Sequence, residues 1–297
     1  MIYITRPEIT EERIVQIQDM IKENPEWNRT KISHAICKLW GWQSPSGQLK
    51  DIAARDMLRE LDKAGKISLP PRQKPSRTKG GADKVMRLEH DTTPIHAQLS
   101  ELQPLYISKI YGGSELAQFK SLIDQYHYLG YDRSIGESLK YMVHDRIGQP
   151  LACLLFASAS WACRGRDEYI GWDKEDRRQK LQFLTNNVRY LILPWVSCQH
   201  LASHVLSLIS RRIADDWRQK YGHPVYCIET YVETGRFKGT CYKAANWIKV
   251  GTTTGRGRDG GHHDAVLPIK DIYLYPLIAN FREILARPEK WGDEKWA

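Results

Sequence analysis

The chain has 297 residues, and its 44 lysines and arginines against 35 aspartates and glutamates give a formal net charge of +9. No apolar run approaches the roughly 18–20 residues that cross a bilayer, and the first residues lack the basic-then-apolar order of a signal peptide. We therefore expect a cytoplasmic protein of about two domains with no membrane partner.

The cysteines and the net charge narrow the class of protein further. None of the six cysteines lies at C-x-x-C spacing, and six are too few for a disulfide scaffold, so we expect reduced thiols and no cysteine-based zinc site. A charge of +9 suits a polyanionic partner such as nucleic acid, although a basic surface can also serve solubility alone.

The first domain is expected over residues 1–70. Apolar spacing predicts helices at 11–23, 29–40 and 48–64, with Leu49, Ile52, Ala53 and Leu61 of the third helix pointing inward, and a short strand at 66–71. Three helices followed by a strand is the order of a winged helix-turn-helix.

The third predicted helix carries Lys50, Arg55 and Arg59, which could contact phosphates or base edges in a groove. A helical module for oligomerisation or for docking a partner remains the alternative. A linker is expected at 71–94, where Lys74, Arg77 and Lys79 would add phosphate contacts and make binding salt-sensitive. The linker could equally be a solvated tether.

A mixed α/β domain is expected over 95–285, followed by a tail at 286–297. The pattern predicts a hairpin, a buried strand, a long helix, another strand, a short helix and a last strand. Their ranges are 139–144 with 151–158, 190–196, 200–221, 225–232, 241–246 and 247–251. The fold class is therefore α+β.

This succession resembles the GNAT acyltransferase fold. A GNAT enzyme that uses acyl-CoA has a glycine-bearing pyrophosphate loop after its central strand. The corresponding stretch here, 197–204, contains no glycine. The sequence therefore shows no recognisable CoA-binding loop and leaves the cofactor unknown.

A glycine-rich segment at 255–260 matches G-x-G-x-x-G, but the residues after it make a poor helix start, which excludes a Rossmann dinucleotide site. Arg256 and Arg258 make this segment a candidate phosphate-binding loop, with a mobile surface loop as the alternative. The following His262, His263 and Asp264 are more typical of a solvated loop than of a metal site, so no metal ligand is assigned.

Glu229 is the leading catalytic candidate because it interrupts an apolar strand, where an unpaired carboxylate is costly. It could act as a general base, or it could simply be paired with an arginine such as Arg189 or Arg236. Tyr242 and Cys241 are the candidate acid and nucleophile, although a buried cysteine that serves as a small apolar residue is the alternative. His127, Tyr131 and Asn246 are expected to complete the pocket, and Arg236 is a further candidate for binding nucleic acid.

Several segments together resemble the Druantia anti-phage protein A family, whose relatives also occur beside transposons. The resemblance spans roughly 10–280. The segments are 42–43, 47–51, 67–71, 127–131, 170–172, 186–187, 191–196, 201–206, 237–247 and 255–258. It implies bacterial defence or mobile-element biology, with DNA or RNA as the partner and other defence or mobile-element proteins as possible further partners.

Three hypotheses follow. The first is a nucleic-acid-binding protein whose GNAT-like domain modifies or processes DNA or RNA. The second is a metal-dependent transposase or nuclease that uses Glu229, Asp264 and a histidine to hold Mg²⁺ or Mn²⁺, and a divalent metal belongs to this hypothesis alone. The third is a non-catalytic DNA-recognition subunit of a larger defence complex.

Overall fold

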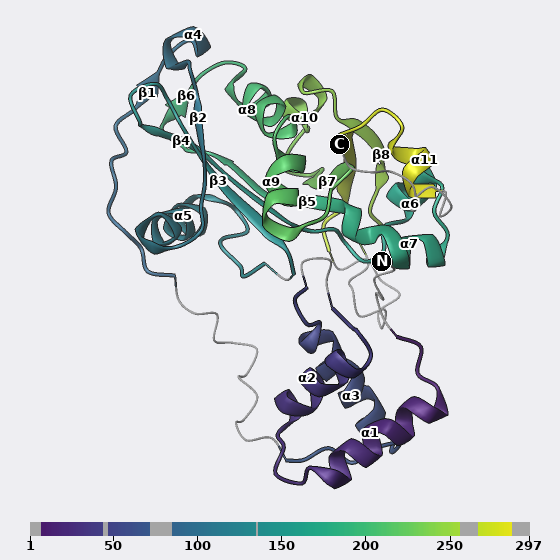
Figure 1. Ribbon diagram of the computed structural model, residues 1–297. Coiled ribbons are helices and arrows are strands. Elements are labelled where there is room, and N and C mark those ends of the chain that lie inside the picture. Colours follow the sequence, from purple (N-terminus) through teal and green to yellow (C-terminus); the bar gives the residue numbers. More distant parts are fainter. Residues whose placement is uncertain (1–6, 44–46, 72–84, 135, 256–266, 287–297) are drawn as a thin grey trace. The chain divides into compact units, whose positions relative to one another are not determined.

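The computed structural model describes residues 7–43, 47–71, 85–134, 136–255 and 267–286 (Figure 1). The chain divides into two compact units: the first comprises Met1–Ala82 with Lys220–His223, and the second comprises Asp83–Gln219 with Pro224–Ala297. The described part of the first unit contains three helices, α1 (Glu11–Glu23), α2 (Arg29–Leu39) and α3 (Asp51–Lys63). Polar side chains cap the N-termini of two of these helices. Thr10 accepts a hydrogen bond from the Arg13 amide of α1, and Asn28 accepts from two amides of α2.

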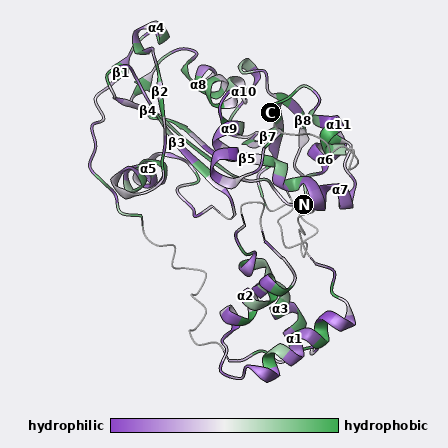
Figure 2. Ribbon diagram, in the orientation of Figure 1, coloured by the Kyte–Doolittle hydropathy of each residue, from purple (hydrophilic) through white to green (hydrophobic). Residues whose placement is uncertain are grey.

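The core of the first unit is built from one face of each helix. α1 shows alternating hydrophilic and hydrophobic positions in Figure 2, as an amphipathic helix does. The buried side chains include Ile14, Ile17, Ile32, Ile36, Met57 and Leu58.

Two expectations for the first unit are wrong. Ile52 and Ala53, expected to point inward, are exposed, Ile52 by 63%, because the buried face of α3 contains the residues Ala54, Met57, Leu58 and Leu61. Residues 66–71 form no strand among the described residues, since the Leu69 amide donates to Asp62 and the Pro70 carbonyl accepts from Arg29. The described residues therefore show helices without the strand expected of a winged helix-turn-helix.

The second unit contains a mixed sheet with the strand order β2-β3-β4-β5-β7-β9-β8 among its described residues. The strands are β2 (Tyr106–Lys109), β3 (Ser138–His144), β4 (Pro150–Ser158), β5 (Leu184–Ile192), β7 (Cys227–Glu233), β8 (Ile248–Thr252) and β9 (Lys270–Pro276). All neighbours are antiparallel except β5 and β7. Every residue from Leu151 to Ala157 of β4 is buried, so both faces of the sheet are covered at its centre.

Helices lie on the sheet and at its ends (Figure 1). They are α4 (Leu99–Leu102), α5 (Gly113–Tyr126), α6 (Arg164–Ile170), α7 (Lys174–Lys180), α8 (Leu201–Ser210), α9 (Ile213–Tyr221), α10 (Thr240–Ala244) and α11 (Phe281–Ala286), with a 3₁₀ turn at Leu181–Phe183. α5 packs against β4 and β5, and α6 packs against β8 and β9. None of the helices in the described ranges has the length and apolar character needed to cross a membrane.

The GNAT-like succession of elements is present, with differences in detail. The long helix expected at 200–221 is two helices, α8 and α9, and the buried strand expected at 190–196 begins earlier, at Leu184. The last residue of that expectation, Val196, belongs instead to β6 (Val196–Ser197), which pairs in parallel with β1 (Ile95–His96). The helix α6 and the strand β9 were not predicted.

The parallel strands β5 and β7 stay together for only three pairs, Leu184↔Cys227, Thr185↔Ile228 and Asn186↔Glu229. Beyond these positions β5 continues along β4 and β7 continues along β9. The two strands therefore diverge in the middle of the sheet, and side chains from both line the space between them.

A β-bulge in β5 changes which side chains reach each face. Phe156 pairs with Asn187 and Leu155 pairs with Arg189, so Val188 is an extra residue in this strand. Because side chains normally alternate, the extra residue turns Asn187 and Arg189 toward opposite faces although they are two residues apart.

The segment that begins α10 is fixed by Gly239. This residue has φ +66°, and a Cβ atom there would lie 2.6 Å from the Tyr273 hydroxyl oxygen. Gly113 has nearly the same φ, +65°, with no atom within 4 Å of its Cβ position, which makes it a matched control.

We expect Gly239→Ala to lower the free energy of unfolding by more than Gly113→Ala. Both changes impose the strain of a left-handed conformation, about 1–2 kcal/mol, but only the first adds a steric overlap. Urea denaturation measures both differences. Equal losses for the two variants would show that the contact with Tyr273 relaxes without cost.

Candidate functional site

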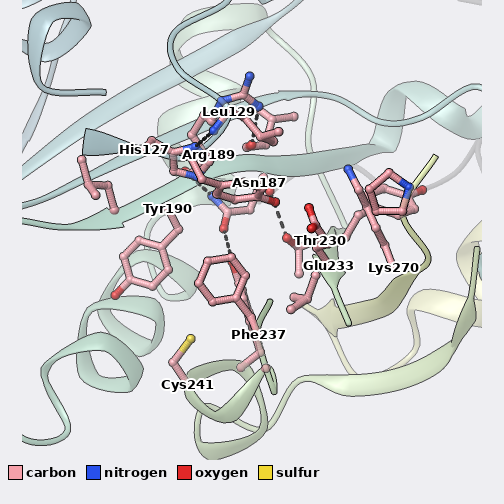
Figure 3. A pocket seen from close by; sticks show the side chains of 18 of the residues that line it. His127, Leu129, Asn187, Arg189, Tyr190, Thr230, Glu233, Phe237, Cys241 and Lys270 are labelled. Carbon is pink, nitrogen blue, oxygen red and sulfur yellow. Dashed lines mark hydrogen bonds between the residues drawn. The ribbon is translucent and has the colours of Figure 1, made fainter. Parts of the chain in front are cut away.

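A cavity of about 920 Å³ opens where β5 and β7 diverge. Figure 3 shows side chains of β5, β7 and the segment that leads into α10 around it. Its lining includes His127 and Tyr128 after α5, Asn186 and Arg189 of β5, and Cys241 and Tyr242 of α10. A space of this size can hold a drug-sized or nucleotide-sized ligand.

Asn187 holds the centre of the site together. Its side-chain amide donates to the backbone oxygens of Leu155 and Arg189, and its Oδ1 accepts from the Tyr242 hydroxyl at 2.8 Å. Thr230 of β7 donates to the Asn187 backbone oxygen at 3.0 Å (Figure 3). These bonds fix α10 against the sheet, and both polar atoms of the Asn187 side chain are hydrogen-bonded.

The side chain of Asn186, the preceding residue, differs from that of Asn187 in its hydrogen bonding. It lines the cavity at the last paired position before the strands diverge. It is 8% exposed, and its Oδ1 is buried without a hydrogen-bond partner in the described part of the chain. A buried acceptor left in this state is costly, so a ligand that donates a hydrogen bond here would remove the cost.

Arg189 lies on the opposite face of the bulged strand from Asn187. Its Nε donates to the Gly130 oxygen at 2.9 Å and its Nη1 donates to the Val188 oxygen at 2.8 Å. Burial lowers the pKa of this guanidinium, while Asp132 nearby raises it. No carboxylate within ion-pairing distance balances it among the described residues, so it is a partly desolvated cation at the cavity.

His127 is neutral at physiological pH. Burial, and then the charge of Arg189, lower the pKa of His127 to about 4. The Leu129 amide donates to its Nδ1 at 3.2 Å, so the ring proton lies on Nε2. His127 therefore offers a hydrogen-bond donor and is a weak base.

Tyr242 and Cys241 also line the cavity, but burial makes both groups less reactive. Burial raises the pKa of the Tyr242 hydroxyl and of the Cys241 thiol. Both groups are therefore protonated at neutral pH, and the Tyr242 proton is already donated to Asn187. This environment does not favour an acid or a thiolate nucleophile.

Glu229 lies beneath the cavity and does not line it. It is fully buried, its Oε1 accepts from the Ser160 amide at 2.6 Å, and its Oε2 pairs with Arg166 at 2.8 Å. The partner is therefore Arg166, and neither Arg189 nor Arg236. Arg166 is also fully buried and pairs with Asp167, which in turn pairs with Arg177. Because both Glu229 oxygens are engaged, this geometry favours a positioning role.

The remaining candidates lie elsewhere. Tyr131 is not among the lining residues, and Asn246 is exposed just after α10 with φ +62°. Arg236 is exposed at the rim, 3.7 Å from Glu233 and 4.8 Å from the centre of the Tyr128 ring. Lys74, Arg77, Lys79, Arg256 and Arg258 lie outside the described residues.

No group of three or more potential metal ligands occurs within the described ranges. The histidines at 262 and 263, together with Asp264, lie outside those ranges. The segment before α8 does not fit a CoA pyrophosphate: β6 is paired with β1, the Leu201 amide bonds to the Cys198 oxygen, and no glycine occurs there.

Sequence reasoning missed Arg166, Lys238 and Lys270 as part of the site or its support. The one available signal was the pair of polar residues Asn186 and Asn187 inside an apolar strand, which breaks its alternation. Nothing in the sequence indicated that Arg166 supports the site, because α6 was not predicted and Glu229 follows 63 residues later.

The sequence model of a family described as Druantia protein DruA matches residues 59–263. The chain belongs to the Druantia protein DruA family. The resemblance read from the sequence is thereby confirmed, and family membership implies other proteins of the same anti-phage defence system as partners. The match begins within α3, so α1 and α2 lie outside it.

Two solved structures similar to this chain are acetyltransferases. A chimera of the spermidine N-acetyltransferase SpeG from Vibrio cholerae is 9% identical, with a TM-score of 0.37, over 58% of this chain and 95% of that chain. Spermidine N-acetyltransferase from Vibrio cholerae in complex with CoA and spermine is 10% identical, with a TM-score of 0.37, over 57% of this chain and 94% of that one. A search of the curated proteins gives no match.

The ion pair beneath the cavity gives a test of its role. Glu229→Gln keeps an acceptor for Ser160 but leaves Arg166 and Arg177 to share the one carboxylate of Asp167. The buried network then carries an unbalanced positive charge, which costs about 3–5 kcal/mol. We expect this loss in urea denaturation, and a smaller loss when Arg166→Met is combined with it.

A Glu229→Gln variant that kept wild-type stability would contradict the positioning role and would favour Glu229 as a chemical group.

The protonation state of His127 gives a second test. Because its pKa in the folded protein is lower than in the unfolded chain, the unfolded chain binds more protons between the two values. The contribution of His127 to stability is therefore complete above the unfolded pKa, and it is lost as the pH falls from there toward about 4. NMR titration of the ring should give a midpoint near 4.

Arg189→Gln should raise the midpoint of this titration only in part, because burial is the larger cause. A midpoint above 6 in the wild type would contradict the buried environment described here.

Proposed function

We propose that the chain is a nucleic-acid-binding protein of anti-phage defence whose cavity between β5 and β7 takes one unpaired nucleotide of a DNA or RNA strand. The observation that carries this proposal is a cavity lined by cations that have no ion pair in the described part of the chain, with exposed aromatic rings at its rim. Arg189, Lys238 and Lys270 line it and make no ion pair among the described residues. The lining includes one carboxylate, Glu233, which lies beside Arg236.

The aromatic rim suits a nucleobase. Tyr128 is 36% exposed and Phe237 is 47% exposed, and their ring centres are 5.3 Å apart. Both residues line the cavity. Exposed rings beside a basic cavity are the means by which proteins stack unpaired bases while holding the phosphates.

Asn186 supports recognition of the base edge. Its amide can accept and donate hydrogen bonds, which is the pattern that base edges complement. An unpaired nucleotide that enters the cavity would bring donors to the buried Oδ1, as happens when proteins hold a base outside its stack.

Recognition is better supported than acid–base chemistry. A general acid or base works best with a pKa near the operating pH, whereas the pKa of His127 is lowered to about 4 and those of Tyr242 and Cys241 are raised. These three groups suit hydrogen bonding and close packing around a base. Nucleoside mass spectrometry of DNA and RNA incubated with the chain tests whether modification follows binding.

We expect Phe237→Ala to weaken binding of single-stranded oligonucleotides by roughly 5- to 150-fold, since base stacking on an aromatic ring contributes about 1–3 kcal/mol. Fluorescence anisotropy with labelled DNA and RNA strands, at several salt concentrations, measures the change. Tyr106→Ala is the matched control, because this ring on β2 is 56% exposed and does not line the cavity.

Wild-type protein that bound neither strand, or a Phe237→Ala variant that bound as well as the control, would overturn the proposal.

A further inference from the structure

The three helices of the first unit differ in charge. α1 has four acidic and two basic residues, and α3 has four acidic and three basic residues. α2 has three basic residues and no acidic one. Among the three helices of the first unit the positive charge is therefore concentrated on α2, whereas the sequence expectation placed it on α3.

The arginines of α3 are already neutralised. Arg55 Nη2 lies 2.7 Å from Asp51 Oδ2, and Arg59 pairs with Asp56, so each guanidinium has a carboxylate from its own helix. To contact a phosphate, these arginines would have to give up those pairs. The remaining carboxylates of α3 would also repel the phosphate backbone.

α2 presents the opposite arrangement. Lys31, His34 and Lys38 follow the i, i+3, i+7 spacing of one helix face, and all three are exposed. The other face carries Ile32 and Ile36, which are fully buried, so the orientation of the helix is fixed by the core.

The two lysines of this face are unbalanced. Within the described ranges neither ammonium group makes an ion pair, while His34 Nε2 lies 3.5 Å from Asp51 Oδ2. Lys31 and Lys38 are two turns apart, about 10.5 Å along the helix axis, so they can reach different phosphates.

We infer that α2 is the surface with which the first unit holds the phosphate backbone of nucleic acid, with Lys31 and Lys38 as the contacts. We assign nucleic acid as the ligand of this helix because a helix with only positive charge complements a polyanion. The inference rests on the nucleic-acid function proposed above, but it uses no residue of the cavity. It also lies outside the residues that the family match covers.

The test compares two double variants of the full chain, Lys31→Gln with Lys38→Gln, and Arg55→Gln with Arg59→Gln. Each pair removes two positive charges, so a general field effect would be the same for both. Duplex DNA affinity is measured by fluorescence anisotropy over a range of salt concentrations. The α2 pair should reduce the slope of log K against log salt by about 1.8, since each phosphate contact contributes about 0.9.

The α3 pair should leave the slope close to that of the wild type. A reduction by the α3 pair that equals or exceeds that of the α2 pair would overturn the inference. An unchanged slope for the α2 pair would also overturn it and would indicate another anionic partner for this face. Urea denaturation of both pairs checks that each variant is folded.

The failures of the two proposals are distinguishable. If Phe237→Ala weakens binding while the α2 pair has no effect, only the α2 surface is wrong. If the wild type binds no nucleic acid, the proposed function fails and the α2 surface fails with it.

Discussion

The short pairing of β5 and β7 is the constraint on which the site depends. These are the only parallel neighbours in the described sheet, and they stay in register for three pairs. Because each strand then follows a different antiparallel neighbour, the sheet opens at its centre. The opening exposes side chains that a continuous sheet would bury, and the bulge at Val188 sends Asn187 to one face and Arg189 to the other.

The ion pair of Glu229 with Arg166 lies at the point of divergence and secures it. A buried pair of this kind adds little net stability by itself, but removing one partner leaves an unbalanced buried charge. Arg166 also donates to the Ser160 oxygen, while Glu229 accepts from the Ser160 amide. The segment after β4, the helix α6 and the strand β7 are thus fixed together next to the cavity, and neither Glu229 nor Arg166 lines it.

The net charge of +9 indicates where a polyanion could bind only after the cations that are already paired with carboxylates are set aside. Many cations of the described residues, including Arg55, Arg59 and Arg166, are balanced by carboxylates close by. The cations without an ion pair among the described residues include Arg189, Lys238 and Lys270 at the cavity and Lys31 and Lys38 on α2. A cation that has no partner interacts with a phosphate at a lower cost, because no existing pair has to be broken, so the location of unpaired charge is more informative than the total.

The sequence by itself determined the main succession of elements from the β3–β4 hairpin to β8, without α6, and the family, and it named His127 and Cys241 as candidates, because helix and strand periodicity and recurring motifs are local properties. Only the tertiary structure decided that Glu229 pairs with Arg166 and that the Asn186 side-chain oxygen has no hydrogen-bond partner among the described residues. Each of these depends on strand register, on a bulge or on which carboxylate lies near a given cation. Such contacts form between residues distant in the chain, or between side chains whose faces are set by packing, and periodicity along the sequence does not encode them.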